Sequence, residues 1–273
     1  MKTAVYFLLL IFSFTFSQAA EFKGSFVQGS FILGKVNPES KVWIDKTKVK
    51  VSKNGYFVFG IGRDRKNNIS IKIIHNEKLK TLEKKVFKRE YKIQKIDGLP
   101  KKQVTPPKEV YERIKKDNIL IGKARAINSD LNFFEKKFIK PLNNAIITGV
   151  YGSQRILNGK PRRPHYGLDY AAKEGTPIKA MLNGIVTLAE PDLYFTGGTI
   201  ILDHGHGIST LYMHMKDIEV EKGQKIRQGE IIGTVGQTGR STGPHLDIRL
   251  NWFNVKLDPS SVLGNKWILK IYH

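Results

Sequence analysis

The sequence contains no cysteine. This absence excludes a cysteine nucleophile, a zinc site built from thiolates and the attachment of lipid to an N-terminal cysteine. It also excludes disulfides, which exported proteins commonly use for stability. The chain must therefore be stabilised by buried apolar surface, for which its 40% hydrophobic content is sufficient, and by any metal that it binds.

Long apolar runs are also scarce, and the one of note is the N-terminal MKTAVYFLLLIFSFTFSQAA. Lys2 provides a positive charge, Ala4–Phe16 an apolar segment and Ser17–Ala19 small residues suited to cleavage. The apolar segment is shorter than the roughly 18 residues that a membrane span requires. Residues 1–20 are therefore predicted to be a secretory signal peptide, with an uncleaved anchor as the alternative. We expect an exported protein of the periplasm or cell envelope.

Acidic residues are few, with 24 Asp and Glu against 46 Lys and Arg, so the net charge is +22. Such a charge favours polyanionic surfaces. With an export signal, the expected partners are an anionic membrane surface and cell-wall carboxylates or phosphates, and not nucleic acid. The alternative is a solvated lysine-rich surface that only adds solubility, since the lysines are spread along the chain. Nothing in the sequence indicates an oligomeric state.

Short apolar segments separated by turn residues predict a mainly β protein with two domains. Residues 21–96 fit a small N-terminal β-sandwich or open barrel, with strands predicted at Val42–Ile44, Val49–Val51 and Ile69–Ile74. Asn54-Gly55, which precedes Tyr56–Phe59, predicts a hairpin turn. Residues 97–137 are expected to form a linker and a helix, and short strands with glycine turns return in residues 138–273.

The predicted helix follows the turn residues DGLP and a Pro-Pro pair. Thr105 can cap its N-terminus, and prolines are tolerated in its first turn. Val110, Ile114, Ile121 and Ala124 fall on one face. This face could dock between the two domains.

The most informative stretch is Gly236–Trp252, GQTGRSTGPHLDIRLNW. A polar loop leads into a predicted strand that begins near Pro244, whose missing N–H suits a first strand position. Residues two apart share one face of a strand, so His245 and Asp247 lie about 6–7 Å apart on one face. The opposite face, which can enter a core, carries Leu246, Ile248 and Leu250. The polar pair is close enough to serve one metal-bound water.

Two earlier stretches are candidate partners: PHYGLD, which contains His165 and Asp169, and LYMH, which ends at His214. On a straight strand His165 and Asp169 would be roughly 13 Å apart, too far to share a metal with bonds of about 2 Å. The segment must therefore bend, and Gly167 is the natural position. The sequence DHGHG, with His204 and His206, is expected to form a hairpin turn in which both histidines are structural, with a position of His206 near the cleft as the alternative.

At these residues the sequence resembles the lysostaphin/LytM-type zinc metallopeptidases, which cleave peptidoglycan cross-links. The resemblance covers about Phe138 to Pro259 and includes, in the family's order, VYGSQR, HYGLD, GTPIKA, DHGHG, YMH and GQTGRSTGPHLD. The ordered set is far more specific than any single motif. It implies a C-terminal antiparallel β-sheet domain of this type and an exported zinc metalloendopeptidase that hydrolyses peptide bonds in peptidoglycan.

The resemblance also implies residue roles. His165, Asp169 and Asp247 occupy the positions of the family's metal ligands, which implies one zinc ion per chain, with another divalent metal as the alternative. His214 and His245 resemble the two histidines that do not bind metal. One takes a proton from the bound water and the other stabilises the developing oxyanion, and the sequence leaves their order open.

Asp247 departs from the family, in which a histidine stands at this position. A carboxylate is a legitimate zinc ligand, and with Asp169 it gives a His/Asp/Asp set. Arg249 lies on the same face and can either orient Asp247 or capture it in a salt bridge that leaves the site incomplete. The rival hypothesis is therefore a catalytically degenerate module that binds cell wall or activates a separate amidase. A polyanion-binding protein driven by charge alone would leave the histidines without a role.

Overall fold

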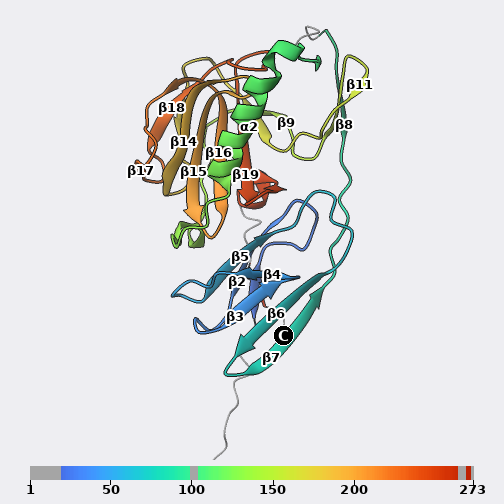
Figure 1. Cartoon of the computed structure of the whole chain (residues 1–273), viewed down its shortest axis with the longest axis vertical. Coiled ribbons are helices and arrows are strands. Elements are labelled where there is room, and N and C mark those ends of the chain that lie inside the picture. Colours follow the sequence, from blue (N-terminus) through green and yellow to red (C-terminus); the bar gives the residue numbers. More distant parts are fainter. Residues whose placement is uncertain (1–19, 99–103, 264–268, 272–273) are drawn as a thin grey trace, which may run out of the picture.

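The computed structural model describes residues 20–98, 104–263 and 269–271, so nearly all of the predicted signal peptide lies outside the described residues. The described chain is mainly β and has two lobes along its long axis, with helix α2 on the larger lobe (Figure 1). The mainly β architecture expected from the sequence is thereby confirmed. Within the described residues, no helix has the length and apolar character needed to cross a membrane.

The N-terminal lobe consists of two four-stranded antiparallel sheets, with strand orders β21-β1-β2-β5 and β4-β3-β6-β7. Their buried side chains belong to one apolar cluster, in which Phe22 packs edge-on against Phe57 with ring centroids 6.1 Å apart. The strands are β1 (Glu21–Lys23), β2 (Phe31–Lys35), β3 (Lys41–Ile44), β4 (Thr47–Val49), β5 (Tyr56–Gly60), β6 (Ile69–His75), β7 (Lys78–Lys84) and β21 (Leu269–Ile271).

The prediction of a hairpin at Asn54-Gly55 is wrong, because the flanking strands β4 and β5 belong to different sheets. The turn itself is present. Gly55 has φ +80°, and a Cβ at this position would overlap the carbonyl oxygen of Val36. Ser52 Oγ accepts hydrogen bonds from the backbone N–H groups of Asn54 and Tyr56, at 3.3 and 3.1 Å. The local signal therefore predicted a turn, whereas packing between the two sheets decided which strands it joins.

The larger lobe contains a ten-stranded antiparallel sheet with the main order β17-β14-β15-β16-β19-β12-β9. Strand β18 pairs with β13 and β16, and β20 pairs with β19. The strands are β9 (Ile146–Gly149), β12 (Leu168–Ala171), β13 (Pro177–Lys179), β14 (Gly184–Leu193), β15 (Gly197–Gly205), β16 (Ile208–Ile218), β17 (Lys225–Ile226), β18 (Ile231–Val235), β19 (His245–Trp252) and β20 (Val255–Leu257). Short 3-10 helices are η2 (Phe133–Glu135) and η3 (Pro259–Ser261).

The predicted helix is present as α2 (Tyr111–Arg125), preceded by the 3-10 helix η1 (Lys108–Val110). Two residues of its predicted apolar face contact the large sheet, since Ala124 is buried and Ile121 packs against the same cluster as Leu188 and Leu211. Val110 precedes the helix as its N-cap residue, and Ile114 is half-buried outside that cluster. The helix therefore lies on that sheet and not between the lobes (Figure 1). Thr105 does not cap it; its hydroxyl instead accepts a hydrogen bond from Arg162 Nη2 at 3.3 Å.

Two strands pair across the limits predicted for the domains. Strand β8 (Ile93–Ile96) leaves the N-terminal lobe and pairs in parallel with β10 (Gln154–Leu157), which also pairs with β11 (Lys160–Pro161). The late strand β21 returns to pair with β1 in the N-terminal lobe. The chain therefore crosses between the lobes in both directions, which ties them together (Figure 1).

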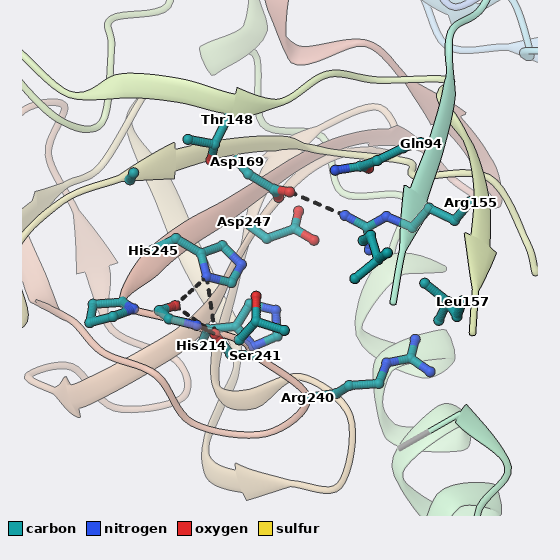
Figure 2. Close-up of a pocket in the computed structure, with 15 residues that line it drawn as sticks. Gln94, Thr148, Arg155, Leu157, Asp169, His214, Arg240, Ser241, His245 and Asp247 are labelled. Carbon is teal, nitrogen blue, oxygen red and sulfur yellow. Dashed lines mark hydrogen bonds and ion pairs between the residues drawn. The ribbon is translucent and has the colours of Figure 1, made fainter. Parts of the chain in front are cut away.

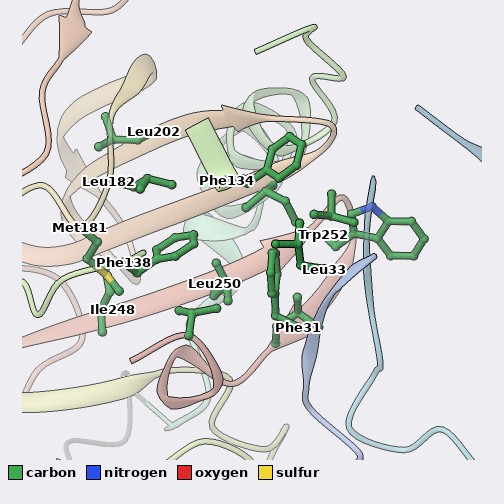
Figure 3. Packing of buried hydrophobic residues seen from close by; sticks show 14 of the residues in the cluster. Phe31, Leu33, Phe134, Phe138, Met181, Leu182, Leu202, Ile248, Leu250 and Trp252 are labelled. Carbon is green, nitrogen blue, oxygen red and sulfur yellow. The ribbon is translucent and has the colours of Figure 1, made fainter. Parts of the chain in front are cut away.

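The lobes also share one hydrophobic cluster. Phe31 of β2 packs edge-on against Phe138, with ring centroids 6.2 Å apart, and Leu33 of β2 and Trp252 of β19 belong to the same cluster (Figure 3). At Gly60 the backbone approaches so closely that a Cβ would lie 2.6 Å from Leu257 Cδ2. The N-terminal lobe is therefore packed directly behind the strand that carries His245 and Asp247.

Phe31→Ala tests this shared cluster. Phe31 is fully buried, and we expect its truncation to lower the free energy of unfolding by about 3–5 kcal/mol. Phe87→Ala is the control, since Phe87 is 57% exposed and the expected change is within about 0.5 kcal/mol. Urea unfolding measured by fluorescence compares the variants. Equal changes would contradict a shared core at Phe31.

Candidate metal centre

His165, Asp169 and Asp247 lie together at one position of the large sheet. Asp169 of β12 stands directly opposite Asp247 of β19 in the antiparallel ladder. His165 precedes β12, where its N–H donates to Ser153 O at 2.9 Å and its carbonyl accepts from the Gly152 N–H at 2.7 Å. Each side chain offers a ligand atom within 4.8 Å of the other two. All three are buried.

Two glycines make room for the paired carboxylates. A Cβ at Gly149 of β9 would overlap Asp169 Oδ2, and a Cβ at Gly167 would overlap Asp247 Oδ1. Gly167 does not have a positive φ, so its function differs from the flexible bend predicted from the sequence. It provides the space that the Asp247 side chain occupies.

The donor atoms fit a cation. His165 Nε2 and Asp169 Oδ1 are 3.1 Å apart, yet both are buried and neither makes a hydrogen bond. Buried polar atoms without partners are rare and require an explanation. A nitrogen and a carboxylate oxygen that face one another in this way are suited to sharing a metal ion. Among the described residues, this is the one such group of three metal-ligating side chains.

An arginine binds each carboxylate. Arg155 Nη2 lies 3.1 Å from Asp169 Oδ2, and Arg249 spans Asp247, with Nη2 2.9 Å from Oδ2 and Nε 3.3 Å from Oδ1. Burial opposes the ionisation of Asp247, but the charge and hydrogen bonds of Arg249 and the charge of His165 hold its pKa well below the usual range. Each carboxylate oxygen has two acceptor positions, so Asp247 retains capacity for a metal.

His214 reaches the same cleft through an irregularity in β16. The residues between Tyr212 and Met215 form a bulge against β15, and His214 has φ +63°. Bulges near active sites often redirect a side chain. His214 Nδ1 lies 2.9 Å from Thr238 O. Since a carbonyl only accepts, Nδ1 is assigned the proton, which leaves Nε2 as an acceptor. Burial lowers the pKa of His214 to about 4.

His245 lies beside His214, with ring centroids 4.7 Å apart. Its Nδ1 donates to Gly243 O at 2.8 Å, and Ser241 Oγ is 3.1 Å away. The loop before β19 therefore sets the orientation of the ring. On the other face of β19, Leu246, Ile248 and Leu250 are fully buried, as the alternation in the sequence predicted.

A cavity of about 330 Å³ is lined by Asp169, Asp247, His214 and His245 (Figure 2). His165 contacts Asp169 but does not line the cavity. One wall comes from the sheet made by β8 and β10, through Gln94, Ile96, Arg155 and Leu157. The sequence analysis missed these residues and also Arg240. Arg155 lies in VYGSQR, a motif recognised as part of the resemblance, whereas Gln94 carries no signal in the sequence.

His204 and His206 of the DHGHG motif lie outside this cavity. The predicted hairpin turn is present, and His206 and Gly207 join β15 to β16 with φ of 51° and 81°. His204 is held by Asn183 O at 2.7 Å and by Thr210 Oγ1 at 2.8 Å, and burial lowers its pKa to about 4. His206 packs against Phe134.

A cleft on an antiparallel sheet that gathers a His/Asp/Asp group and two further histidines is typical of a metallohydrolase. Residues 163–259 match the model of peptidase family M23. The chain therefore carries a peptidase M23 domain, as the motifs indicated.

Similar proteins agree with this assignment. The chain is 40% identical over 124 residues to the DD-carboxypeptidase/endopeptidase Mpg of Neisseria gonorrhoeae, which covers 45% of this chain and 28% of that protein. It is 41% identical over 87 residues to the peptidoglycan DD-endopeptidase ShyA of Vibrio cholerae, covering 32% of this chain and 20% of that protein. The matched segments thus span less than a third of either relative.

The chain is similar over most of its length to a solved structure of a bacterial protein. A Pseudomonas aeruginosa protein assigned to peptidase M23 superposes with a TM-score of 0.69 at 25% identity, covering 88% of this chain and 96% of that one. The likeness extends well beyond residues 163–259, so the N-terminal lobe is part of a shared architecture.

Gly167→Ala tests whether space for Asp247 matters to the site. The new methyl group would displace the carboxylate, and we expect divalent-metal affinity to fall about 10- to 100-fold, as for other residues that position ligands. The matched control is Gly243→Ala, where a Cβ meets nothing within 4 Å. Competition titration with a zinc indicator measures both variants. Unchanged affinity in Gly167→Ala would contradict this role.

Proposed function

We propose that the protein is an exported zinc metalloendopeptidase that hydrolyses peptide bonds in peptidoglycan. The observation that carries the proposal is the buried pair of His165 Nε2 and Asp169 Oδ1, which face each other without a hydrogen bond beside Asp247. The names of the Neisseria and Vibrio relatives support peptidoglycan as the substrate. Export is part of the proposal, because peptidoglycan lies in the cell envelope and residues 1–20 have a signal-peptide pattern.

His165, Asp169 and Asp247 are the residues that would hold the ion. When bound, zinc would supply Lewis acidity, which activates water and polarises the scissile carbonyl. Arg155 and Arg249 would hold the two carboxylates in orientation, because each donates to an oxygen of one of them. Such outer partners commonly set the geometry of metal ligands.

The two remaining histidines divide the proton chemistry. His214 is neutral at pH 7, because burial lowers its pKa to about 4, so its unprotonated Nε2 can accept a proton from the attacking water. His245 is less buried than His214 and lines the same cavity. It is left to stabilise negative charge that develops on the carbonyl oxygen. This role requires a second proton on Nε2, because Nδ1 already donates to Gly243 O. The hydrogen bonds to Thr238 O and Gly243 O fix both rings before substrate binds.

The second candidate function is a degenerate module that binds cell wall or activates a separate amidase. The observation that favours it is the double contact of Arg249 with Asp247, which competes with a metal for the same carboxylate. The two functions differ in two measurable properties, zinc binding and sacculus digestion. The enzyme binds zinc and digests sacculi, whereas the module does neither.

His165→Ala and His214→Ala separate metal binding from proton transfer. We expect His165→Ala to lose both zinc and sacculus digestion. His214→Ala should retain zinc and lose about 10²–10⁴-fold in activity, the usual contribution of a general acid or base. His75→Ala, at the end of β6 in the other lobe, is the control. Metal analysis and dye release from labelled sacculi are the measurements, and full activity in His214→Ala would remove it from the mechanism.

Asp247 decides between the two candidate functions. If it completes the site, Asp247→Ala should lose zinc, whereas Asp247→His should retain zinc at least as well because imidazole suits this metal. Zinc content and sacculus digestion are measured for the wild type and both variants. A wild type that carries no zinc and digests nothing, together with an Asp247→His variant that gains both, would establish the degenerate module.

A further inference from the structure

The sheet β4-β3-β6-β7 of the N-terminal lobe has one face in the core and one face turned away from it. Val42 and Ile44 of β3 and Ile71 of β6 are buried in the cluster that the lobes share. Successive side chains of a strand point to opposite faces of its sheet, so the residues between them point outward. This outer face carries Lys41, Trp43, Lys48, Lys72, Ile74 and Leu79.

Trp43 lies between two lysines in one row across the outer face. It stands opposite Lys48 of β4 and opposite Lys72 of β6, and both lysines are exposed. Lys48 Nζ lies 5.8 Å from the centroid of the Trp43 ring. A tryptophan flanked by lysines presents an apolar ring next to positive charge, a combination suited to the boundary between an apolar phase and water.

The neighbouring row is more apolar. Ile74 of β6 stands opposite Lys41 of β3 and opposite Leu79 of β7. Leu79 is 62% exposed, and neither Leu79 nor Ile74 packs against a hydrophobic cluster of the described residues. Removing such side chains from water is favourable in proportion to their apolar area. The two are therefore available to contact an apolar phase outside the protein.

The charge of the outer face is unbalanced. No ion pair of the described residues involves Lys41, Lys48 or Lys72. Within these four strands the one acidic residue is Glu83, which stands opposite Ser70. The face is therefore positive and complementary to an anionic partner.

We propose that this outer face binds the anionic surface of a lipid bilayer. The lysine ammonium groups would lie among the lipid phosphates, while Trp43, Ile74 and Leu79 enter the headgroup layer. Lysines on flexible stems and aliphatic side chains suit a fluid layer, in which neither requires a partner of fixed geometry. A glycan strand would instead require polar groups directed at its hydroxyls.

Binding by this face leaves the metal cleft free. None of the six residues lines the cleft, and β6 and β7 lie at the end of the N-terminal lobe away from the large lobe (Figure 1). The inference goes beyond the proposed peptidase function and does not depend on it, because it concerns a different surface and requires no chemical step.

The test measures partition of the protein onto lipid vesicles by co-sedimentation. The protein begins at Ala20, the first described residue, because the apolar segment before it would bind vesicles by itself. Vesicles of phosphatidylcholine are compared with vesicles of equal parts phosphatidylcholine and phosphatidylglycerol. We expect much stronger binding to the mixed vesicles, and we expect this binding to weaken as salt is added because the Debye length shortens.

Two variants test the outer face. Replacing both Lys48 and Lys72 by Gln should weaken binding to the mixed vesicles about 30-fold, since each lysine at an anionic surface contributes a factor of about five. Leu79→Gln should weaken binding roughly tenfold, because less apolar area leaves water.

The matched control replaces both Lys115 and Lys116 by Gln, which removes the same charge from exposed positions of α2 on the other lobe. It should bind as wild type does, because charges more than a Debye length of about 8 Å from the bilayer are largely screened. Equal thermal midpoints establish that the variants are folded.

Three outcomes would overturn the proposal. Equal losses in the two double variants would show that total charge drives binding, without a defined face. Wild-type binding that does not depend on phosphatidylglycerol would exclude recognition of an anionic surface. If replacing Lys48 and Lys72 weakened binding to isolated sacculi and left vesicle binding unchanged, the face would belong to the cell wall. No hydrolysis is measured, so the result is independent of whether the protein is a peptidase.

Discussion

The pairing of Asp169 with Asp247 across β12 and β19 is the constraint on which the site depends. The ladder places two buried carboxylates directly opposite one another, where like charges repel and water is excluded. Such an arrangement persists only if positive charge compensates for it. Arg155 and Arg249 contribute part of that charge. His165 supplies a nitrogen rather than a further carboxylate. Its Nε2 atom and Asp169 Oδ1 are buried without a hydrogen bond, so they are suited to binding a cation.

Several features of the fold follow from this pair. Gly149 and Gly167 lack side chains where the carboxylates need space. The bulge in β16 turns His214 toward Asp247, whereas a regular strand would alternate residues between the two faces. Behind β19, Leu246, Ile248 and Leu250 anchor the strand in a core that continues into the N-terminal lobe. The geometry of the site is therefore supported by packing on both sides of the sheet.

The sequence predicted those parts of the structure that depend on local pattern. Alternation placed His245 and Asp247 on one face of a strand, and the helical spacing identified the buried face of α2. It could not predict which strands pair, so Asn54-Gly55 was assigned to a hairpin that does not form. The sequence also could not predict that Arg155 contacts Asp169 or that Gln94 lines the cleft. These contacts join residues from different strands, and no spacing along the chain encodes them.

The cleft includes residues that lie outside the segment that matches the peptidase family. That segment comprises residues 163–259, yet Arg155, which binds Asp169, and Gln94, which lines the same wall of the cleft as Arg155, both precede it. Strand β8 brings Gln94 there by pairing with β10, and β21 returns the chain to the N-terminal lobe. A shift of that lobe would therefore move a wall of the cleft, because β8 is continuous with it. The N-terminal lobe is consequently part of the structure that defines access to the cleft.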